Sequence, residues 1–578
     1  MGAFLPTRLL RAGKSTKSPL IVLSTQGTLG YWPGFLVIIA AKDNLPWQED
    51  QPFQNWKSWG ATMDELFALL SDFKNHGERT AICLGEEEIS FSRLACAVDG
   101  LADYLVREGF GPSRPLATLL PNGFDQIVTH LGALMSGVPL IRLNVAFAPA
   151  QIAHCLKTFA PFGLVATSDQ LKALRLEYSL NDIRVLLSGS LEGLSRPGPG
   201  TILRGHPAAV ALATLATEPG QVATVTFTSG TTARPKGVIH SRRAVLHAIR
   251  RSARLMRFSQ KDVVFVRLAL YGQLGMIVQC LPALVAGATV ELALGGPVEV
   301  YQRALSTGRE KTVVVDGPSI IAEVLRHPES QGFRFDSLRR VVVGGDFVPP
   351  RFQAKAGHLL GDRFSVAYGM TEVGMISILD QDSRETNCGL VGFPLEDTEI
   401  RVVDDGGNDL PAGQMGDILV RTPSSFEGYW GQPDLTRSVL LPDGWVATGD
   451  IGQLETSGML RLLGRRKEML VYQGWKIAPV EVETVLQAHP GVQQAAIAGV
   501  GDSPENQRME AFIVVREHFY PSPSREDLHE LAAARLARYM VPEEIHFVRR
   551  LPHFPSGKLD RERLSMISLA GLWEELNE

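Results

Sequence analysis

A short run of hydroxyls, glycines and one lysine follows an apolar stretch of the chain. Val222–Phe227 is rich in Val and Thr, which predicts a buried strand. Small or hydroxyl-bearing residues come next: Thr228, Ser229, Gly230, Thr231 and Thr232. Such residues let backbone N–H groups and hydroxyls converge on one anion, and Lys236 adds positive charge. The run predicts a phosphate-binding loop, with a Ser/Thr/Gly-rich surface turn as the alternative. It differs from the common nucleoside-triphosphate loop, because Pro235 rather than Gly precedes the lysine.

Two further groups of residues have side chains suited to a nucleotide. Gly344 and Gly345 end an apolar run, where the missing side chain would let a flat base approach the backbone; a turn at a strand end would also explain them. Glu372 is a carboxylate of the kind that Mg²⁺ binds together with substrate phosphates. Asp450 can accept both hydroxyls of a ribose, although an isolated Asp is more often a turn residue.

Charged residues recur near the C-terminus. Arg465 and Lys467 lie where the composition changes, and as exposed charges alone they would be unremarkable. Lys558 follows Pro-Ser-Gly, a turn that presents the lysine on a loop, whereas a terminal surface lysine is ordinarily only solvated.

The elements that must position these residues alternate along the chain. Helices are expected at 92–107 and 125–135, and strands at 139–143, 263–266, 312–315 and 338–343, which is the rhythm of a parallel sheet flanked by helices. Polar and apolar residues alternate over 399–420 around Gly/Asp turns, which predicts antiparallel strands. Beyond 464, helices at 480–487 and 525–539 and strands at 495–500 and 511–515 predict a small α+β unit.

Length and composition set the domain number and exclude some classes. A chain of 578 residues is too long for one core. We expect an extension of uncertain order at 1–62, a large domain at 63–463, a small domain at 464–565 and a tail at 566–578. The net charge of −5 gives no sign of a nucleic-acid partner, and five scattered cysteines favour a reducing, cytoplasmic compartment without structural zinc. The broken apolar stretch at 20–41 predicts no stable membrane span.

Taken together, the motifs form an ordered series. After the loop come VVVGGD (341–346), YGMTE (368–372), DGWVATGD (443–450), GRRKE (464–468), GWKIAPVE (474–481) and PSGK (555–558). In this order and spacing, residues 63–565 resemble the adenylate-forming superfamily of acyl-CoA synthetases, non-ribosomal peptide adenylation domains and luciferases. The resemblance implies an α/β fold whose large domain has two βα-rich subdomains and a small β-barrel-like part, followed by a mobile α+β domain.

The resemblance also implies a role for each matching residue. Thr228–Thr232 and Lys236 would hold the β- and γ-phosphates of ATP. Gly344, Gly345, Asp346, Tyr368 and Gly369 would form the adenine site, Thr371 would contact the adenylate phosphate, and Asp450 and Arg465 the ribose. Glu372 would bind Mg²⁺, and Lys558 the carboxylate and α-phosphate. Lys467 would be the hinge, and the segment from Gly474 and Trp475 would serve the second half-reaction.

The reaction implied is activation of a carboxylic acid, such as a fatty or other non-amino acid, to acyl-AMP, with transfer to coenzyme A. A stand-alone ligase that loads the phosphopantetheine of an acyl carrier protein is one alternative, and a non-catalytic nucleotide-binding relic is another. The substrate pocket is expected at Tyr271, Gly272 and Gln273.

Three positions depart from the family pattern. Ala233 replaces a usual glycine of the phosphate loop, which puts the catalytic rate in doubt. Gly272 stands where many aryl and short-acid ligases have histidine, which leaves space in the pocket. No Asp is found at the position that holds an α-amino group, so an amino-acid substrate is disfavoured.

Overall fold

The structure is a computed structural model that describes residue 73 and residues 75–175, 178–189, 220–228, 235–293, 299–301, 312–326, 338–380, 389–472, 475–501, 507–516, 519–552 and 559–577. The chain divides into two compact units, residues 1–51 and 52–578, and every described residue belongs to the second. The expected extension at 1–62 therefore lies outside the described residues. Phe73, the first described residue, is helical and buried.

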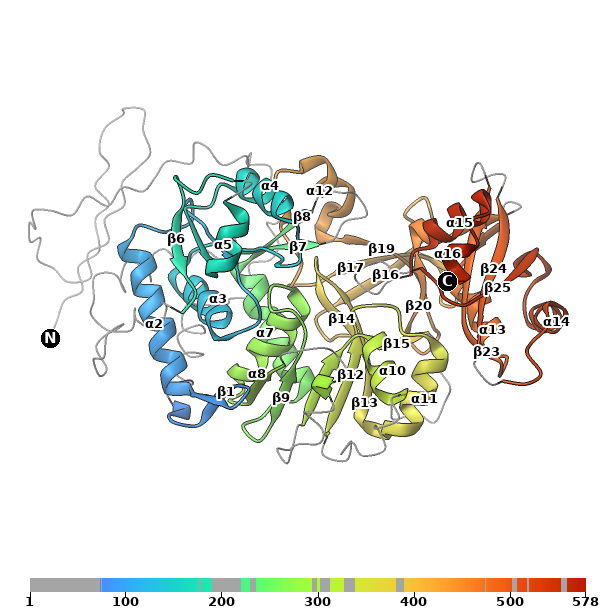
Figure 1. Ribbon diagram of the computed structural model, residues 1–578, viewed down its shortest axis with the longest axis horizontal. Coiled ribbons are helices and arrows are strands. Elements are labelled where there is room, and N and C mark those ends of the chain that lie inside the picture. Colours follow the sequence, from blue (N-terminus) through green and yellow to red (C-terminus); the bar gives the residue numbers. More distant parts are fainter. Residues whose placement is uncertain are drawn as a thin grey trace, which may run out of the picture. The chain divides into compact units, whose positions relative to one another are not determined.

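The larger sheet has 13 strands in the order β16-β17-β19-β20-β15-β14-β13-β12-β11-β9-β10-β1-β2 (Figure 1). Its parallel strands are β1 (Thr80–Leu84), β10 (Thr289–Leu292), β9 (Val263–Val266), β11 (Val313–Asp316), β12 (Arg340–Gly344) and β13 (Phe364–Met370). Strands β11 and β12 are buried along their whole length, as their runs of valine predict for a sheet covered on both faces.

Antiparallel strands extend this sheet. They are β2 (Glu87–Ser90), β14 (Gly374–Asp380), β15 (Leu390–Pro394), β16 (Glu399–Val403), β17 (Gly416–Arg421), β19 (Val446–Leu454) and β20 (Leu460–Arg465). The antiparallel strands expected over 399–420 are confirmed. Strand β20 runs through to Arg465 and so crosses the boundary expected at 463/464.

The second sheet has the order β18-β8-β7-β4-β3-β5-β6. Its strands are β3 (Leu116–Leu119), β4 (Leu140–Arg142), β5 (Gly163–Ala166), β6 (Arg184–Leu187), β7 (Val222–Thr228), β8 (Lys236–Ser241) and β18 (Gly428–Tyr429). Strands β7 and β8 form an antiparallel hairpin, while β7 is parallel to β4. The strand expected at 222–227 is confirmed.

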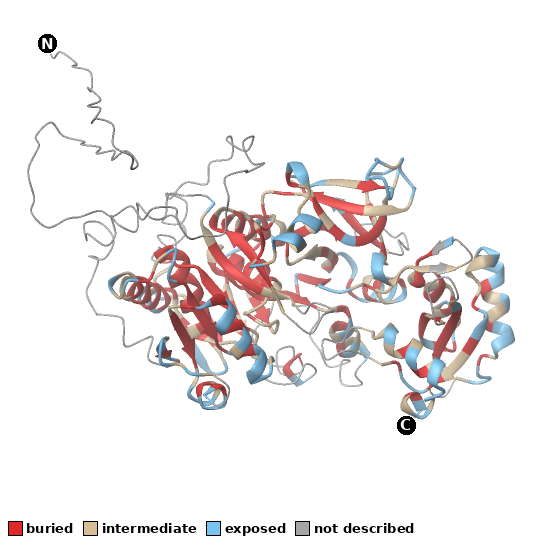
Figure 2. Cartoon of the chain, turned by 90° about the horizontal axis from the view of Figure 1, so that it is seen from above, coloured by how far each residue is buried: buried red, intermediate tan, exposed pale blue. Residues whose placement is uncertain are grey.

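Helices cover both sheets. They are α2 (Phe91–Arg107), α3 (Phe124–Ser136), α4 (Pro149–Phe159), α5 (Ser168–Leu174), α7 (Arg242–Met256), α8 (Leu281–Val285), α10 (Pro318–Arg326), α11 (Pro350–Leu360), α12 (Pro433–Val439) and the π-helix η2 (Leu274–Cys280). The largest core joins α2, α3, α7, η2 and α8 to strands of both sheets. Figure 2 shows buried residues along strands and along the helices beside them. None of the described helices is long and apolar enough to cross a membrane.

A small α+β part completes the described chain. It contains β21 (Leu470–Tyr472), β22 (Trp475–Ile477), α13 (Pro479–Gln487), β23 (Val492–Val500), β24 (Arg508–Val515), α14 (Arg525–Arg535), β25 (Glu544–Val548), α15 (Arg561–Ala570) and α16 (Glu574–Asn577). One buried cluster includes residues of α13, α14 and the three-stranded sheet β23-β24-β25, and another joins that sheet to α15 and α16.

Two expectations for this part were wrong. The helix expected over 525–539 ends at Arg535, because Leu536 has extended backbone angles and a 3₁₀ turn follows at Arg538–Met540. The expected tail from 566 lies largely in α15 and α16, where Ile567 and Leu576 are buried. Residues up to 577 therefore pack with the small domain.

Candidate active site

The hairpin of β7 and β8 positions the ends of the expected phosphate loop. Thr228 and Lys236 are opposite each other as the last pair in its register. The loop residues between them, Ser229, Gly230, Thr231, Thr232, Ala233 and Arg234, lie outside the described residues. The structure therefore places the two ends of the loop side by side, and phosphate binding stays a prediction.

Lys236 and Glu372 are brought together by a tyrosine that sequence reasoning missed. The Lys236 ammonium lies 5.7 Å from the centre of the Tyr429 ring, within the range of a cation–π contact. The Tyr429 hydroxyl donates to Glu372 Oε1 at 2.7 Å. Burial first, and then the charge of Glu372, raise the pKa of Tyr429, which keeps its hydroxyl protonated as a donor. Gly428 and Tyr429 in a Gly/aromatic run were the only sequence signal.

The glycines after β12 fit the close approach expected there. A Cβ at Gly344 would lie 2.6 Å from the carbonyl oxygen of Ala367, so no side chain fits without movement of the backbone. Gly345 has a φ of +80°, which favours glycine. Gly345, Asp346, Tyr368 and Gly369 line one cleft of about 980 Å³. Asp346 is exposed, and its side chain accepts from the Phe347 N–H at 2.9 Å.

The same cleft is lined by a buried carboxylate held from two sides. Strands β19 and β20 pair Asp450 with Arg465, whose Nε lies 2.9 Å from Asp450 Oδ1. On the other side, the Tyr368 hydroxyl donates to Asp450 Oδ2 at 2.5 Å. Burial, followed by the charge of Asp450, raises the pKa of Tyr368 well above its usual value, so the hydroxyl stays a donor. Three residues assigned separately from motifs thus form one hydrogen-bonded group.

The expected substrate segment adjoins a buried arginine. Tyr271 and Gly272 are half-buried and Gln273 is buried, between β9 and the π-helix η2. Arg142 at the end of β4 donates from Nη1 to the Gly272 carbonyl at 3.2 Å and from Nη2 to Gln273 Oε1 at 2.8 Å. Nη2 also donates to the hydroxyl of Thr226, the residue paired with Arg142 in the sheet. Sequence reasoning missed Arg142, although one arginine in the apolar run 138–143 was a signal.

Two buried histidines lie near Arg142. Burial lowers the pKa of His130 well below its usual value and that of His240 to about 3, and the charge of Arg142 lowers both further. His240 also lies beside the backbone of Thr371, the residue expected at the adenylate phosphate. Both rings are therefore neutral at physiological pH, and Arg142 is the charged member of this group.

The remaining site residues are only partly described. Lys467 is exposed in a 3₁₀ turn (Arg466–Glu468) between β20 and β21, and its role as a hinge stays a prediction. Trp475 at the start of β22 is 54% exposed, and its ring stacks on Tyr539 at 4.6 Å between centroids. Gly474 and Lys558 lie outside the described residues.

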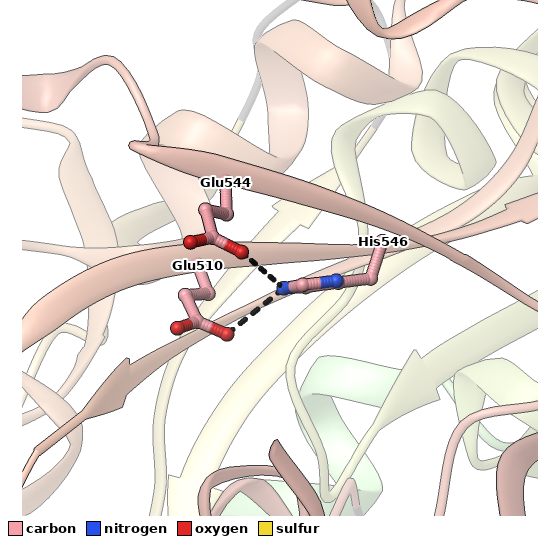
Figure 3. A group of neighbouring side chains, drawn as sticks. All are labelled: Glu510, Glu544 and His546. Atoms are coloured by element: carbon pink, nitrogen blue, oxygen red, sulfur yellow. Dashed lines mark hydrogen bonds and ion pairs between the residues drawn. The ribbon is translucent and has the colours of Figure 1, made fainter. Parts of the chain in front are cut away.

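A separate cluster of titratable side chains lies on β24 and β25 of the small domain. His546 Nε2 lies 2.9 Å from Glu510 Oε2 and 3.6 Å from Glu544 Oε2 (Figure 3). Glu510 also accepts from Ser568 of α15 at 2.6 Å and from Arg508 at 3.0 Å. These contacts tie two strands and a helix together.

Comparison with known proteins places this geometry in a family. The model of the AMP-binding enzyme family matches residues 71–430, and that of its C-terminal domain matches residues 481–558. A sulfoacetate–CoA ligase of Cupriavidus necator is 30% identical over 82% of this chain and 92% of that protein. A long-chain-fatty-acid–CoA ligase of Escherichia coli is 25% identical over 83% of this chain and 90% of that protein.

A solved structure agrees with the sequence relatives. The amide bond synthetase McbA from Marinactinospora thermotolerans superposes with a TM-score of 0.74 at 27% identity, and covers 87% of this chain and 99% of that one. The α/β fold with a large N-terminal and a small C-terminal domain is thereby confirmed. Because the family model spans well over half of the chain, the protein belongs to the family of AMP-binding enzymes.

Proposed function

We propose that the protein activates a carboxylic acid with ATP and transfers the acyl group to the thiol of coenzyme A. In the first step a carboxylate oxygen attacks the α-phosphorus, the bond to the β-phosphate breaks, and acyl-AMP and pyrophosphate form. In the second step the thiol, as it loses its proton, attacks the acyl carbon and AMP leaves. The mixed anhydride is needed because a carboxylate oxygen is a poor leaving group.

The observation that carries the proposal is the group of Tyr368, Asp450 and Arg465 at the wall of the 980 Å³ cleft. Asp450 is 2% exposed, and its Oδ1 lies against Arg465 while its Oδ2 accepts from Tyr368, so its carboxylate is fixed in place. A carboxylate oxygen can accept more than one hydrogen bond, and we assign the ribose hydroxyls to Asp450. Gly345 is exposed and lines the same cleft, so its backbone is open to the base.

Lys236 and Glu372 supply the opposite charges for the phosphate end. Lys236 would stabilise negative charge that develops on the phosphates, together with Thr228 and Thr371 and with Lys558 of the small domain. Glu372 is 7% exposed and has one oxygen occupied by Tyr429, which fits a cation that takes few carboxylates besides phosphates. Glu372 would hold Mg²⁺, which when bound supplies a Lewis acid at the phosphate oxygens.

The second half-reaction would use another face of the small domain. Gly474 and Trp475 would contact the pantetheine arm, and Lys467 would act as the hinge. Trp475 supports this role because its indole is more than half exposed and stacked on Tyr539, so it presents a rigid aromatic surface.

The names of the related proteins specify different acids and different acceptors of the acyl group. Their names include sulfoacetate and long-chain fatty acids, so both kinds of acid fall within the fatty or other non-amino acid expected from the sequence. The synthetase McbA forms amide bonds, so a related fold also serves a nitrogen acceptor. Coenzyme A is the acceptor we propose, because both of these sequence relatives are CoA ligases.

The test measures the two half-reactions separately. Exchange of labelled pyrophosphate into ATP across a panel of carboxylic acids should appear with some acids and be absent without acid. AMP release should then depend on free coenzyme A, and less on a purified carrier protein or an amine. Absence of exchange with every acid would indicate a non-catalytic nucleotide-binding protein. AMP release only with the carrier protein would show that the carrier protein, and not coenzyme A, is the acceptor.

A further inference from the structure

Arg142 is a buried charge without a carboxylate partner among the described residues. Its side chain is fully buried, and its acceptors are a hydroxyl, an amide oxygen and a backbone carbonyl. In the part of the chain that the structure describes, its Nε–H has no hydrogen-bond partner. Burial lowers the pKa of Arg142 to about 9, which still leaves the guanidinium charged at neutral pH.

Other buried arginines in the large domain are compensated. Arg251 lies 2.9 Å from Asp397, and Arg340 pairs with Asp380. Arg242 has no such pair with a described carboxylate, but it donates to the carbonyl of Leu134 in the last turn of α3, at the negative end of the helix. Since an isolated buried cation is costly, Arg142 stands out as a charge that no carboxylate of the described residues balances.

The position of Arg142 connects this charge to the reaction. It lies beside Thr226, two residues before the phosphate loop, and it holds the carbonyl of Gly272 in the substrate segment. Among the described residues outside its chain neighbours, a Cβ at Gly272 would meet one atom within 4 Å, the Ala269 carbonyl oxygen at a close 3.2 Å. An anionic group of a substrate bound beside Gly272 would therefore lie next to the guanidinium that holds the Gly272 carbonyl.

The reacting carboxylate is a poor match for this charge. It loses its charge when it becomes the acyl-adenylate, which would leave Arg142 unbalanced again before the second step. Moreover, tight binding of the reacting group itself would stabilise the ground state and slow the reaction. A second anionic group on the acid keeps its charge through both half-reactions and would balance Arg142 throughout.

We infer that the substrate is a carboxylic acid bearing a second anionic group, a carboxylate or a sulfonate, that pairs with Arg142. This inference rests on the proposed acid activation and narrows its substrate class. Arg142 then selects the acid, while Lys236 and Glu372 serve the nucleotide.

The test compares acids of similar length with and without the second charge. Succinate is paired with butanoate, and malonate and sulfoacetate with propanoate, so the arms distinguish carboxylate from sulfonate. In pyrophosphate exchange the wild-type enzyme should favour a dianionic acid in kcat/KM by about 10-fold or more, because a site built for a polar group discriminates against analogues that lack it. In Arg142→Met the ratio should fall to about one, and in Arg142→Lys it should lie between.

The control is Arg242→Met, which also removes a buried arginine. It should lower the melting temperature but keep the wild-type ratio. A wild-type ratio at or below one for every pair, with exchange measurable, overturns the inference and leaves the proposed function standing. An unchanged ratio in Arg142→Met also overturns it. If Arg142→Met does not fold, the wild-type ratio and the ratio measured for Arg142→Lys test the inference instead. No exchange with any acid would instead refute the proposed function.

Discussion

Two buried charges, one in each domain, have opposite surroundings. The acceptors of Arg142 in the large domain are all neutral within the described ranges, and burial disfavours its charged form. Glu510 in the small domain is equally buried, but Arg508, His546 and Ser568 all donate to it (Figure 3 shows its bond to His546). Burial raises the pKa of Glu510, yet these partners outweigh it and the net pKa is lowered.

The contrast indicates two kinds of buried charge. Some are paired within the protein and stabilise the fold, and others are expected to pair with a bound ligand. Around Glu510 every partner belongs to β24, β25 or α15, so the group is complete without a substrate. Lys236 resembles Arg142 in this respect, because its contact in the structure is the ring of Tyr429 rather than a carboxylate. We therefore expect mutations at the two kinds of site to change different quantities.

The largest effect is expected for Lys236→Ala. Removal of one charge-stabilising group of this type costs roughly 10²- to 10³-fold in rate. Pyrophosphate exchange should fall by this factor while the melting temperature stays close to that of the wild type. Lys172→Ala is the matched control, since Lys172 is an exposed lysine paired with Asp169. Equal losses of pyrophosphate exchange in both variants would show that Lys236 does not act at the phosphate site.

Glu510→Gln should have the opposite profile. The variant keeps the shape but removes the charge that three donors share, which should cost about 1–3 kcal/mol in unfolding free energy. Denaturant unfolding should report this loss, and exchange per mole of folded protein should stay within about twofold. Glu544→Gln is the control, because Glu544 is half exposed and exposed ion pairs contribute about 0–1 kcal/mol. Loss of exchange in Glu510→Gln without loss of stability would contradict the division between charges that stabilise the fold and charges that pair with a ligand.

The pH dependence of unfolding gives a further test of the stabilising charge of Glu510. Because the pKa of Glu510 is below its usual 4.5 in the folded protein, its ionised form stabilises the fold above that pH. The stabilisation is lost as pH falls through the lower folded value. The titratable or charged side chains that face Glu510 are Glu544, Arg508 and His546. The stability gap between wild type and Glu510→Gln should therefore narrow below pH 4.5, as thermal unfolding at several pH values can measure. A gap that stays constant down to acid pH would mean that the charge of Glu510 is not the source.

Regular elements could be predicted because their signals are local. Strand β9 lies at the expected residues 263–266, and α2 and α3 extend one residue or so beyond expectation, since apolar periodicity and a cap at Ser90 define them. The C-terminal helices α15 and α16 were missed because their buried residues are few and far apart. Only the sheet against which they pack reveals that they belong to the domain.

The site shows the same division between local and long-range information. Motifs identified Tyr368, Asp450 and Arg465 one by one, but their hydrogen bonds depend on strands β13, β19 and β20, which meet only in the folded chain. Arg142 and Tyr429 belong to no motif that we recognised. Their importance comes from partners 57 to 131 residues away in sequence, which no local pattern can supply.

The smallest effect is expected for Tyr429→Phe. This variant tests whether Glu372 is one of the charges that are expected to pair with a ligand. The hydroxyl donates to one oxygen of Glu372 and thereby fixes the carboxylate. Without it the carboxylate is free to rotate, at a cost of about 0.5–1.5 kcal/mol for one hydrogen bond, which corresponds to roughly 2- to 10-fold in affinity. If Glu372 holds Mg²⁺, the Mg²⁺ concentration for half-maximal exchange should rise by this factor, and the rate at saturating Mg²⁺ should change little. Tyr520→Phe, at a residue 94% exposed, should leave the curve unchanged. A lower melting temperature with an unshifted Mg²⁺ curve would instead place the pair with Glu510, as a contact that serves the fold.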